Sequence, residues 1–392
     1  MPSSSPTPPA DELFDVAVIG AGIVGAATAC FASASARVLV LETEANAGMH
    51  TTGRSAALFT EAYGPPNVRA LTRASRAFYD APPPGFAEVP LLQPRGTLYV
   101  GREDQRAEAQ ALREQLLREG SAAEWMEGEA VRRWVPVLRP EASAVAVHDP
   151  AAFDIEVDAL LQGFLRTARA QGAQWVPSAR VVGLHREGGM WWLATGDGRR
   201  FRARQVVNAA GAWADEVASL AGLPRVGLEP RRRSAFLFGA PEGLSVERWP
   251  AVIALDESWY LKPDAGLLLG SPANADPAPP HDVVAEELDI AIGIDRIQRA
   301  TTPSIRRPRN TWAGLRCFVA DGEPVCGFDP LAPGFFWAAA VGGYGIQSAP
   351  AFGRLCASLL CGREVPADIA AQGLDLRALA PRRESLSDNR GH

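Results

Sequence analysis

The sequence predicts an α/β protein of two domains, the second of which is sheet-rich and of the α+β kind. Three stretches each combine an apolar strand, a glycine-rich turn and a helix, the unit from which parallel sheets covered by helices are built. The stretches between them contain alternating strand patterns and proline-rich joints, which favour a separate domain. The length of 392 residues suits two domains of ordinary size.

The charge and the cysteine content argue against two classes of protein. The net charge of −6 disfavours a nucleic-acid partner, because binding to phosphate backbones needs a basic face. The five cysteines are odd in number and form no CxxC pair. We therefore expect reduced thiols in a cytoplasmic protein, with no disulfide framework and no metal site.

The start of the chain raises the questions of export and of membrane insertion. Residues 1–13 lack the basic start and apolar middle of a signal peptide, and we interpret them as a disordered leader. Residues 17–36 carry no charge, and 20 residues is the length of a membrane span. They are mostly alanine, glycine and serine, so we expect no transmembrane segment.

The first unit carries a turn of the form GxGxxG, made by Gly20, Gly22 and Gly25. Gly20 permits the tight turn, Gly22 lets the backbone approach a pyrophosphate, and Gly25 lets helix and strand pack closely. The N–H groups at the start of the helix attract phosphate. The next strand, at 37–42, ends in Glu42, which is placed to accept ribose hydroxyls. The motif predicts a dinucleotide site and leaves NAD and FAD open.

The other two units lie at residues 202–222 and 334–360. One nucleotide domain is thus assembled from the start, the middle and the end of the chain, whereas NAD domains are usually contiguous. This pattern resembles the large flavoproteins with a glutathione-reductase-like, Rossmann-type FAD domain, so FAD outranks NAD. The last helix is expected to point its N-terminus at the flavin edge that carries negative charge after reduction.

The segments in between predict the second domain. We expect a strand at 95–101, a charged helix with a solvated face at 102–120, and a strand at 229–238. A hairpin at 251–272 and a helix at 282–300 follow. On the strand at 229–238, alternation places Arg231, Arg233, Ala235 and Leu237 on one face and Arg232 on the other.

Proline-rich joints at 81–84, 223–230 and 302–308 mark expected crossings between the domains. The resulting division assigns 14–85, 145–222 and 311–375 to the FAD-binding domain, 86–144 and 223–310 to the substrate-binding domain, and 376–392 to a flexible tail.

Several strings in this order are similar to one known family. They include GRSAA, NAAGAWAD, RRSAF, DESWYLKPDAGLLLGSPANADP, TWAGLR, FVADG and GGYGIQ, and they cover residues from about 14 to about 375. Together they resemble the FAD-dependent D-amino-acid oxidase and dehydrogenase family, and most closely its bacterial D-arginine dehydrogenases. The resemblance implies non-covalent FAD and oxidation of a D-amino acid to an imino acid, by hydride transfer from Cα to flavin N5. Water then hydrolyses the product to a 2-oxo acid and ammonia, and a quinone or the respiratory chain takes the electrons.

The same resemblance implies four catalytic residues. Arg233 and Arg316 match the two arginines that hold the substrate carboxylate, a task for which a planar guanidinium is well shaped. Tyr63 and Tyr260 match the two tyrosines that flank the substrate, where each supplies a ring wall and a hydroxyl.

Further residues are assigned to the pocket and to the cofactor by the family pattern. The loop 54–64 is expected to pass over the flavin, to line the pocket, and to end as a gate at Gly64, Pro65 and Pro66. The remaining pocket residues are Leu58, Thr60, Thr97, Ala251, Ile253, Gly314, whose carbonyl accepts from the amine, and Gln347. The cofactor residues, besides the glycines and Glu42 named above, are Ile23, Thr43, Gly53, Arg54, Ser55, Ala210, Gly211, Gly342, Gly343, Tyr344, Gly345, Ile346 and Gln347.

Two departures from the D-arginine dehydrogenases bear on the substrate. Leu58 stands where those enzymes have a histidine, and Thr97 stands where they have a glutamate that pairs with the substrate guanidinium. Loss of one partner of a buried charge pair costs on the order of 2–5 kcal/mol. We therefore expect a preference for neutral, apolar D-amino acids in a pocket made by Leu58, Ala251, Ile253 and the two tyrosines. No general base remains in the loop, which leaves the amine proton to solvent.

The sequence leaves other functions open. An oxidase of the same fold, acting on a D-amino acid or on an N-methylated glycine with oxygen, is the near alternative. A non-catalytic flavin-binding protein is the remote one. Cys317 follows Arg316 directly, and some amine-oxidising relatives bond their flavin to a cysteine in this part of the chain, but a buried free thiol is favoured.

Overall fold

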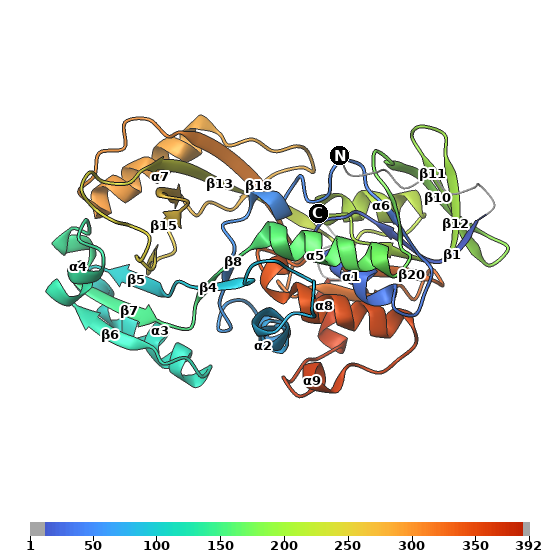
Figure 1. Cartoon of the computed structure of the whole chain (residues 1–392), viewed down its shortest axis with the longest axis horizontal. Coiled ribbons are helices and arrows are strands. Elements are labelled where there is room, and N and C mark those ends of the chain that lie inside the picture. The colour runs from blue at the N-terminus through green and yellow to red at the C-terminus, as the bar shows by residue number, and fades with distance from the viewer. Residues whose placement is uncertain (1–11, 387–392) are drawn as a thin grey trace.

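Two large β-sheets organise residues 12–386, the part of the chain that the computed structural model describes (Figure 1). An eight-stranded sheet with its covering helices occupies the right half of Figure 1, and a nine-stranded sheet occupies the left half. A small sheet of β3 (Leu58–Phe59), β8 (Phe153–Ile155) and β4 (Leu92–Pro94) lies between them. The predicted α/β class, with a Rossmann-type domain beside a sheet-rich domain, is confirmed.

The eight-stranded sheet has the three predicted units at its centre. β1 (Leu13–Ile19) pairs in parallel with β2 (Val38–Leu41) on one side and with β12 (Arg200–Asn208) on the other. β12 then pairs in parallel with β20 (Phe335–Ala339), so segments from the start, middle and end of the chain are joined as expected. The outer strands are β9 (Gln174–Val176), β10 (Val181–Glu187), β11 (Met190–Thr195) and β19 (Val325–Phe328).

Helices cover both faces of this sheet because its strands are apolar on both sides. In β1, Val16 and Val18 belong to one buried cluster, while Phe14, Ala17 and Ile19 belong to another. The first cluster includes helices α1 (Ile23–Ala32), α5 (Val157–Ala170) and α8 (Gly345–Leu360), and the second includes α6 (Ala214–Leu220).

Close backbone packing requires glycine at two points around α1. A Cβ at Gly25 would lie 1.9 Å from the carbonyl oxygen of Gly20, and a Cβ at Gly353 in α8 would lie 2.7 Å from the Cβ of Ala27 and 3.0 Å from its carbonyl oxygen. Gly25 therefore has the packing role that its place in the motif predicts.

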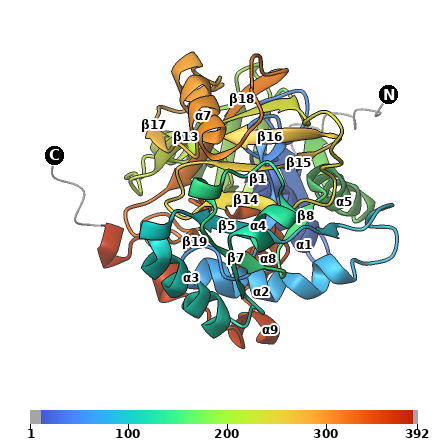
Figure 2. The same ribbon diagram turned by 90° about the vertical axis from the view of Figure 1, so that its left-hand side faces the viewer.

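The nine-stranded sheet is built around β13 (Glu229–Gly239), which pairs with β18 (Asn310–Phe318) over nine residues. Figure 2 shows helix α7 (Glu287–Ala300) near β13 and β16 on this sheet. The other strands of the nine-stranded sheet are β5 (Thr97–Gly101), β6 (Glu124–Glu127), β7 (Val145–Asp149), β14 (Ala251–Ala254), β15 (Tyr260–Asp264), β16 (Leu267–Ser271) and β17 (Asp276–Pro277). The remaining helices are α2 (Pro66–Asp80), α3 (Arg106–Arg118), α4 (Glu129–Trp134) and α9 (Ala367–Ala370).

The predicted alternation along β13 is confirmed. Arg232 points toward α7 and pairs with Asp289 at 2.9 Å, on the same face of the strand as the buried Phe236. Arg233 and Ala235 line a cavity on the opposite face. The period of the strand thus decides which arginine is structural and which is available to a ligand.

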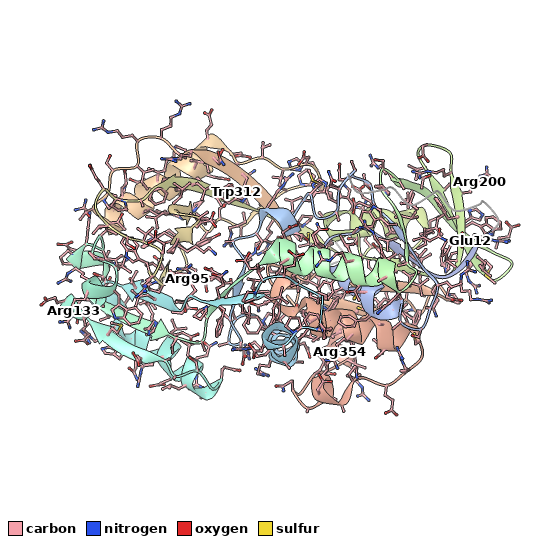
Figure 3. All side chains as sticks on the ribbon, viewed as in Figure 1. Glu12, Arg95, Arg133, Arg200, Trp312 and Arg354 are labelled. Carbon is pink, nitrogen blue, oxygen red and sulfur yellow. The ribbon has the colours of Figure 1, made fainter. Side chains whose placement is uncertain are left out.

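A carboxylate on the small sheet ties it to the second domain. Asp154 accepts hydrogen bonds from Arg95 Nε and from Lys262 Nζ, both at 2.6 Å, and all three side chains are largely buried. Arg95 is labelled in Figure 3. Leu58 is the ladder partner of Asp154, so this ion triad also positions the start of the loop that leads to Tyr63.

Three boundaries differ from those expected. Residues 145–149 and 311–318 were assigned to the FAD-binding domain, but as β7 and β18 they pair with strands of the nine-stranded sheet. The helix expected at 282–300 begins only at Glu287. The hydrogen-bonding partner of a strand is a long-range property, which the local pattern does not contain.

The tail expected to be flexible is packed as far as residue 386. Leu379 is buried, and Arg382 pairs with the fully buried Asp329 at 2.6 Å. Arg383 pairs with Asp321 at 2.7 Å. Residues 387–392 of that tail, and residues 1–11 of the expected leader, lie outside the described residues. Within residues 12–386, no helix has the length and apolar character needed to cross a bilayer.

Candidate active site

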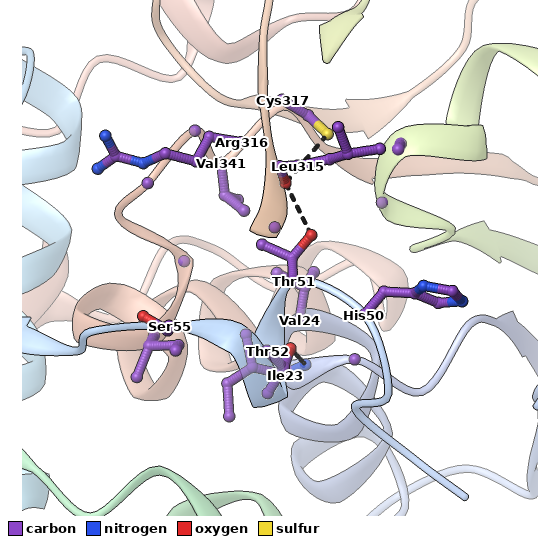
Figure 4. A pocket seen from close by; sticks show the side chains of 18 of the residues that line it. Ile23, Val24, His50, Thr51, Thr52, Ser55, Leu315, Arg316, Cys317 and Val341 are labelled. Atoms are coloured by element: carbon purple, nitrogen blue, oxygen red, sulfur yellow. Dashed lines mark hydrogen bonds between the residues drawn. The ribbon is translucent and has the colours of Figure 1, made fainter. Parts of the chain in front are cut away.

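A cavity of about 940 Å³ is lined by residues of both large sheets and of the loops between them. Figure 4 shows part of this cavity, with α1 residues Ile23 and Val24 on one side and β18 residues Leu315, Arg316 and Cys317 on the other. Its size and its mixed polar and apolar lining suit a cofactor together with a small substrate.

The nucleotide end of the cavity begins at the GxGxxG turn. Gly20 has a φ of +98°, and a Cβ there would lie 2.6 Å from the carbonyl oxygen of Ala209, so only glycine fits. Glu42 is buried and lines the cavity, while its carboxylate accepts the N–H groups of Ala21 at 2.7 Å and Glu44 at 2.9 Å. Glu42 thus shapes the turn while facing the position expected for a ribose.

Two helix N-termini face the same cavity. α1 begins after Gly22 and α8 begins after Tyr344, neither N-cap residue caps its helix with a side chain, and neither first turn holds an acidic residue, although Ile23 N–H of α1 donates to Thr52 Oγ1 at 3.0 Å. Ile23 and Gly345, at the starts of these helices, both line the cavity. The positive ends of two helix dipoles therefore favour a ligand with negative charge, such as a pyrophosphate.

Most of the expected cofactor residues line this cavity, and three do not. Gly25 packs α1 onto β1, and a Cβ at Gly53 would lie 2.7 Å from the Gly48 carbonyl oxygen, so both serve the backbone. Tyr344 packs edge-on against Tyr63, with ring centroids 5.1 Å apart. Those that line it are Gly20, Gly22, Ile23, Glu42, Thr43, Arg54, Ser55, Ala210, Gly211, Gly342, Gly343, Gly345, Ile346 and Gln347.

The two predicted substrate arginines lie at one end of the cavity without acidic partners. Arg233 Nε donates to the carbonyl of Asn274 at 2.5 Å, and the rest of its guanidinium faces the cavity. Arg316 passes so close to Gly343 that a Cβ there would lie 1.7 Å from its Nη2. Within residues 12–386, neither arginine forms an ion pair with a carboxylate. Two uncompensated positive charges in one chamber indicate an anion site.

The electrostatics of this chamber support the same conclusion. Burial, and then the positive charge of Arg316, lower the pKa of the Arg233 guanidinium below its ordinary value. Burial raises the pKa of Tyr344 to about 12, so this neighbour stays neutral. A bound carboxylate would relieve the repulsion between the guanidinium groups, which gives the chamber affinity for one.

The expected pocket residues around the arginines divide into two groups. Leu58, Thr60, Tyr63, Ile253, Tyr260 and Gly314 line the cavity. Gln347 also lines it, but its Nε2 donates to Thr72 Oγ1 at 3.0 Å, so its amide holds α8 against α2.

Thr97 and Ala251 do not line the cavity. They are partners in the β5–β14 ladder, and both side chains are buried beneath its wall. Tyr99, two positions along β5 and therefore on the same face as Thr97, forms the wall instead. The expectation that Thr97 and Ala251 form part of the pocket surface is therefore wrong, because both side chains are buried and Tyr99 lines the cavity at this point.

Sequence reasoning missed further lining residues, among them three from one helix and one acidic residue from a turn. Leu112, Gln115 and Leu116 come from α3, which was interpreted as a helix with a solvated face. Its apolar positions were a usable signal, since they mark the side that packs. Glu257 lines the cavity from the turn between β14 and β15 with a φ of +52°, and no local pattern marked this acidic residue.

The family can now be named from the sequence profile. The profile of the FAD dependent oxidoreductases, called DAO, matches residues 15–359. The chain belongs to this family. Membership confirms the expected FAD cofactor, and the glycine turn, the buried Glu42 and the two helix N-termini of the cavity fit that group. A nearer kinship with the D-arginine dehydrogenases remains a proposal.

Individual relatives in the DAO family are distant. FAD-dependent oxidoreductase domain-containing protein 1 of Mus musculus is 25% identical over 89% of this chain and 81% of its own length. The Bos taurus protein of that name is 27% identical, but the match spans only 35% of its length and 40% of this chain. Glycine oxidase of Bacillus licheniformis is 24% identical over 90% of this chain and 94% of its own.

Solved structures show the same fold. Glycine oxidase from Geobacillus kaustophilus superposes with a TM-score of 0.82 and 22% identity, covering 95% of this chain and 99% of that one. L-proline dehydrogenase from P. horikoshii superposes with a TM-score of 0.74 and 20% identity, covering 94% of this chain and 97% of that one.

Cys317 has the properties of a buried free thiol. It lines the cavity, and its Sγ lies 3.8 Å from the carbonyl oxygen of Leu315 (Figure 4). Burial raises its pKa to about 12, so the thiol is protonated at neutral pH and is a poor nucleophile. This supports the expectation of non-covalent FAD.

Proposed function

We propose that this protein catalyses FAD-dependent oxidative deamination of D-amino acids and prefers neutral, apolar side chains to D-arginine. The observation that carries the proposal is the pair Arg233 and Arg316, which faces one chamber without a carboxylate partner within residues 12–386. Arginine binds carboxylates through paired hydrogen bonds, and an α-amino acid presents one carboxylate next to its reacting carbon.

Two tyrosines and a backbone carbonyl add to the proposed positioning of the substrate α-carbon. The hydroxyl of Tyr63 lies beside the Arg316 guanidinium, and Tyr260 lines the same chamber from β15. Gly314 lines it from β18, where its carbonyl is the proposed acceptor for the substrate amine. A carboxylate anchor and an amine acceptor together orient the Cα–H bond, which is the contribution of the protein to the rate.

The preference for neutral side chains follows from the rest of the wall. Leu58, Ile253 and Leu112 are apolar, and Tyr99 is kept neutral because burial raises its pKa above the ordinary value. Glu257 is the acidic residue of this wall, but it is exposed to solvent, where pairing with a cation contributes little. Thr97 is fully buried and offers no charge.

When bound, FAD accepts the hydride that leaves the substrate Cα. The amine must lose its proton first, and the described part of the chamber offers no histidine for this task. His50 lines the cavity, but it lies on the opposite side of Figure 4 from Arg316 and pairs with Glu44 at 3.0 Å. Solvent is therefore the proposed acceptor of the proton, and kcat/KM is expected to rise with pH as the substrate amine deprotonates.

Anaerobic bleaching of the flavin spectrum by separate D- and L-amino acids tests the proposal. We expect D-leucine, D-methionine and D-phenylalanine to bleach the flavin and to give a higher kcat/KM than D-arginine. Bleaching by L-enantiomers alone, or a dominant kcat/KM for D-arginine or D-lysine, would overturn it. A protein that binds FAD but is bleached by no amine would be the non-catalytic alternative.

An oxygen-using oxidase of glycine or sarcosine is the second candidate. Glycine oxidase of Bacillus licheniformis, which matches 90% of this chain, favours it. Glycine and sarcosine in the same panel, followed with an oxygen electrode and with a dye acceptor, separate the two candidates. A quinone or respiratory acceptor and a cytoplasmic location remain part of the first proposal.

A further inference from the structure

Residues 278–285, called the strap below, lie between β17 and α7 of the second domain and pack against the nucleotide domain at Val283. Val283 is buried in a cluster with Ala212 of the nucleotide domain and Leu315 of β18. Its neighbours Asp282 and Val284 have exposed side chains, so Val283 is the apolar anchor of the strap. Asp282 also lines the cavity assigned to FAD.

Arg54 holds the strap through hydrogen bonds of its guanidinium group, which are called the clasp below. Its Nη1 donates to the carbonyl of Val283 at 2.7 Å and to that of Ala313 at 3.2 Å. Its Nη2 pairs with Asp282, and its Nε donates to the carbonyl of Met49 at 3.1 Å. Four of the five N–H donors of an arginine are thereby used within the protein. The expectation that Arg54 serves the cofactor by direct contact does not account for this arrangement.

The loop that carries Arg54 is itself held to β18 by hydrogen bonds. Trp312 Nε1 donates to the carbonyl of Arg54 at 3.0 Å, and Thr51 Oγ1 donates to that of Leu315 at 2.7 Å (Figures 3 and 4). These bonds join the loop of Arg54 to β18 without involving the strap. A loop held in this way gives the guanidinium a fixed position from which to hold a segment that lacks regular structure.

A second group reinforces the clasp. His50 lies with its ring centroid 4.8 Å from that of Trp213, and its Nδ1 is 3.8 Å from the Asp282 carboxylate. Arg54, His50, Trp213 and Asp282 all line the FAD cavity. The strap belongs to one domain and most of its partners belong to the other, so its place at the cavity wall depends on contacts between the domains.

We propose that the strap retains FAD and that Arg54 is the positioning residue that keeps it closed. FAD then leaves, and enters, through opening of the strap. The Asp282 side chain is 73% exposed, so solvent screens its ion pair, and the two carbonyl contacts of Nη1 carry most of the clasp. The proposal concerns cofactor retention and does not depend on which amine the enzyme oxidises.

Release of FAD from the holoenzyme, followed by the rise in free-flavin fluorescence after dilution, tests this. Arg54→Ala is expected to release FAD at least about tenfold faster, since a hydrogen bond to a charged group contributes about 1.5–3 kcal/mol. Asp282→Asn is expected to change the rate by less than about threefold. Arg299→Ala is the control, because Arg299 is 79% exposed and its ion pair among residues 12–386 is with Asp295 at 3.0 Å.

Hydrogen exchange of residues 278–285 in the same variants distinguishes a clasp from a direct cofactor contact. Faster exchange in the strap together with faster FAD release supports the proposal. Faster release with unchanged strap protection, or unchanged release, overturns it. If Arg54→Ala does not fold, two other variants replace it. Arg54→Lys keeps the positive charge but lacks the planar guanidinium, and Val283→Ala weakens the packing of the strap without changing the Arg54 side chain. FAD release and hydrogen exchange of the strap are then measured in these variants.

Discussion

Replacing Gly343 by alanine is expected to abolish most of the turnover while leaving the protein folded and yellow. The added Cβ would lie 1.7 Å from Nη2 of Arg316 and 2.0 Å from both its Cζ and Nε, where ordinary contact begins at 3.4 Å. Gly343 is not among the glycines with positive φ, so alanine meets no backbone strain there. The three atoms nearest to the added Cβ all belong to Arg316, so the main effect is expected on its guanidinium.

The size of the effect follows from the overlap. The guanidinium must move by roughly 1.5 Å, and a misplacement of about 1 Å can reduce a rate on the order of 100-fold. We expect kcat/KM for the best substrate to fall by at least that factor, with KM rising because the carboxylate anchor is displaced. The measurement is steady-state kinetics on Gly343→Ala beside its flavin spectrum.

Gly239→Ala is the matched control for this experiment. Gly239 ends β13, the strand of Arg233, and a Cβ there would meet nothing within 4 Å. Its kinetics should equal those of the parent. Wild-type kcat/KM in Gly343→Ala, with the flavin bound, would refute the assignment of Arg316 to the carboxylate.

Three further predictions follow from single contacts. Arg316→Met should remain yellow and lose turnover, and undiminished turnover would contradict the proposed anchor. Because burial raises the pKa of Cys317 to about 12, iodoacetamide should leave it unmodified in the native protein at pH 8 and label it after unfolding; native labelling, seen by peptide mass analysis, would show a reactive thiolate. Asp329→Asn, which breaks the buried pair with Arg382, should lower the free energy of unfolding by about 3–5 kcal/mol. In urea titrations Asp368→Asn, at an exposed pair with Arg354, should lower it by less than about 1 kcal/mol, and equal losses would contradict the role of burial.

Local patterns in the sequence were sufficient for the framework of the fold. The glycine turn at Gly20, the acidic end of β2 at Glu42 and the three strand–glycine–helix units depend on residues close in sequence, and the structure joins them in one sheet. Alternation along β13 was enough to separate Arg233 from Arg232, because side chains of a strand point to opposite faces.

Which residues form the wall of the site was decided by tertiary structure. Tyr99 covers Thr97, α3 contributes part of the cavity wall, and Glu257 reaches it from a turn. Each of these depends on how one element lies against another, and no period or motif within the element records that placement.

The sequence by itself determined the family, the FAD cofactor and the two arginines that face one chamber. Only the tertiary structure showed that Gly343 makes room for Arg316, that β18 belongs to the second sheet, and that Arg54 holds the strap. The physical reason is that each of these three facts is a contact between residues far apart in the chain, whose distance is set by packing and not by local conformation.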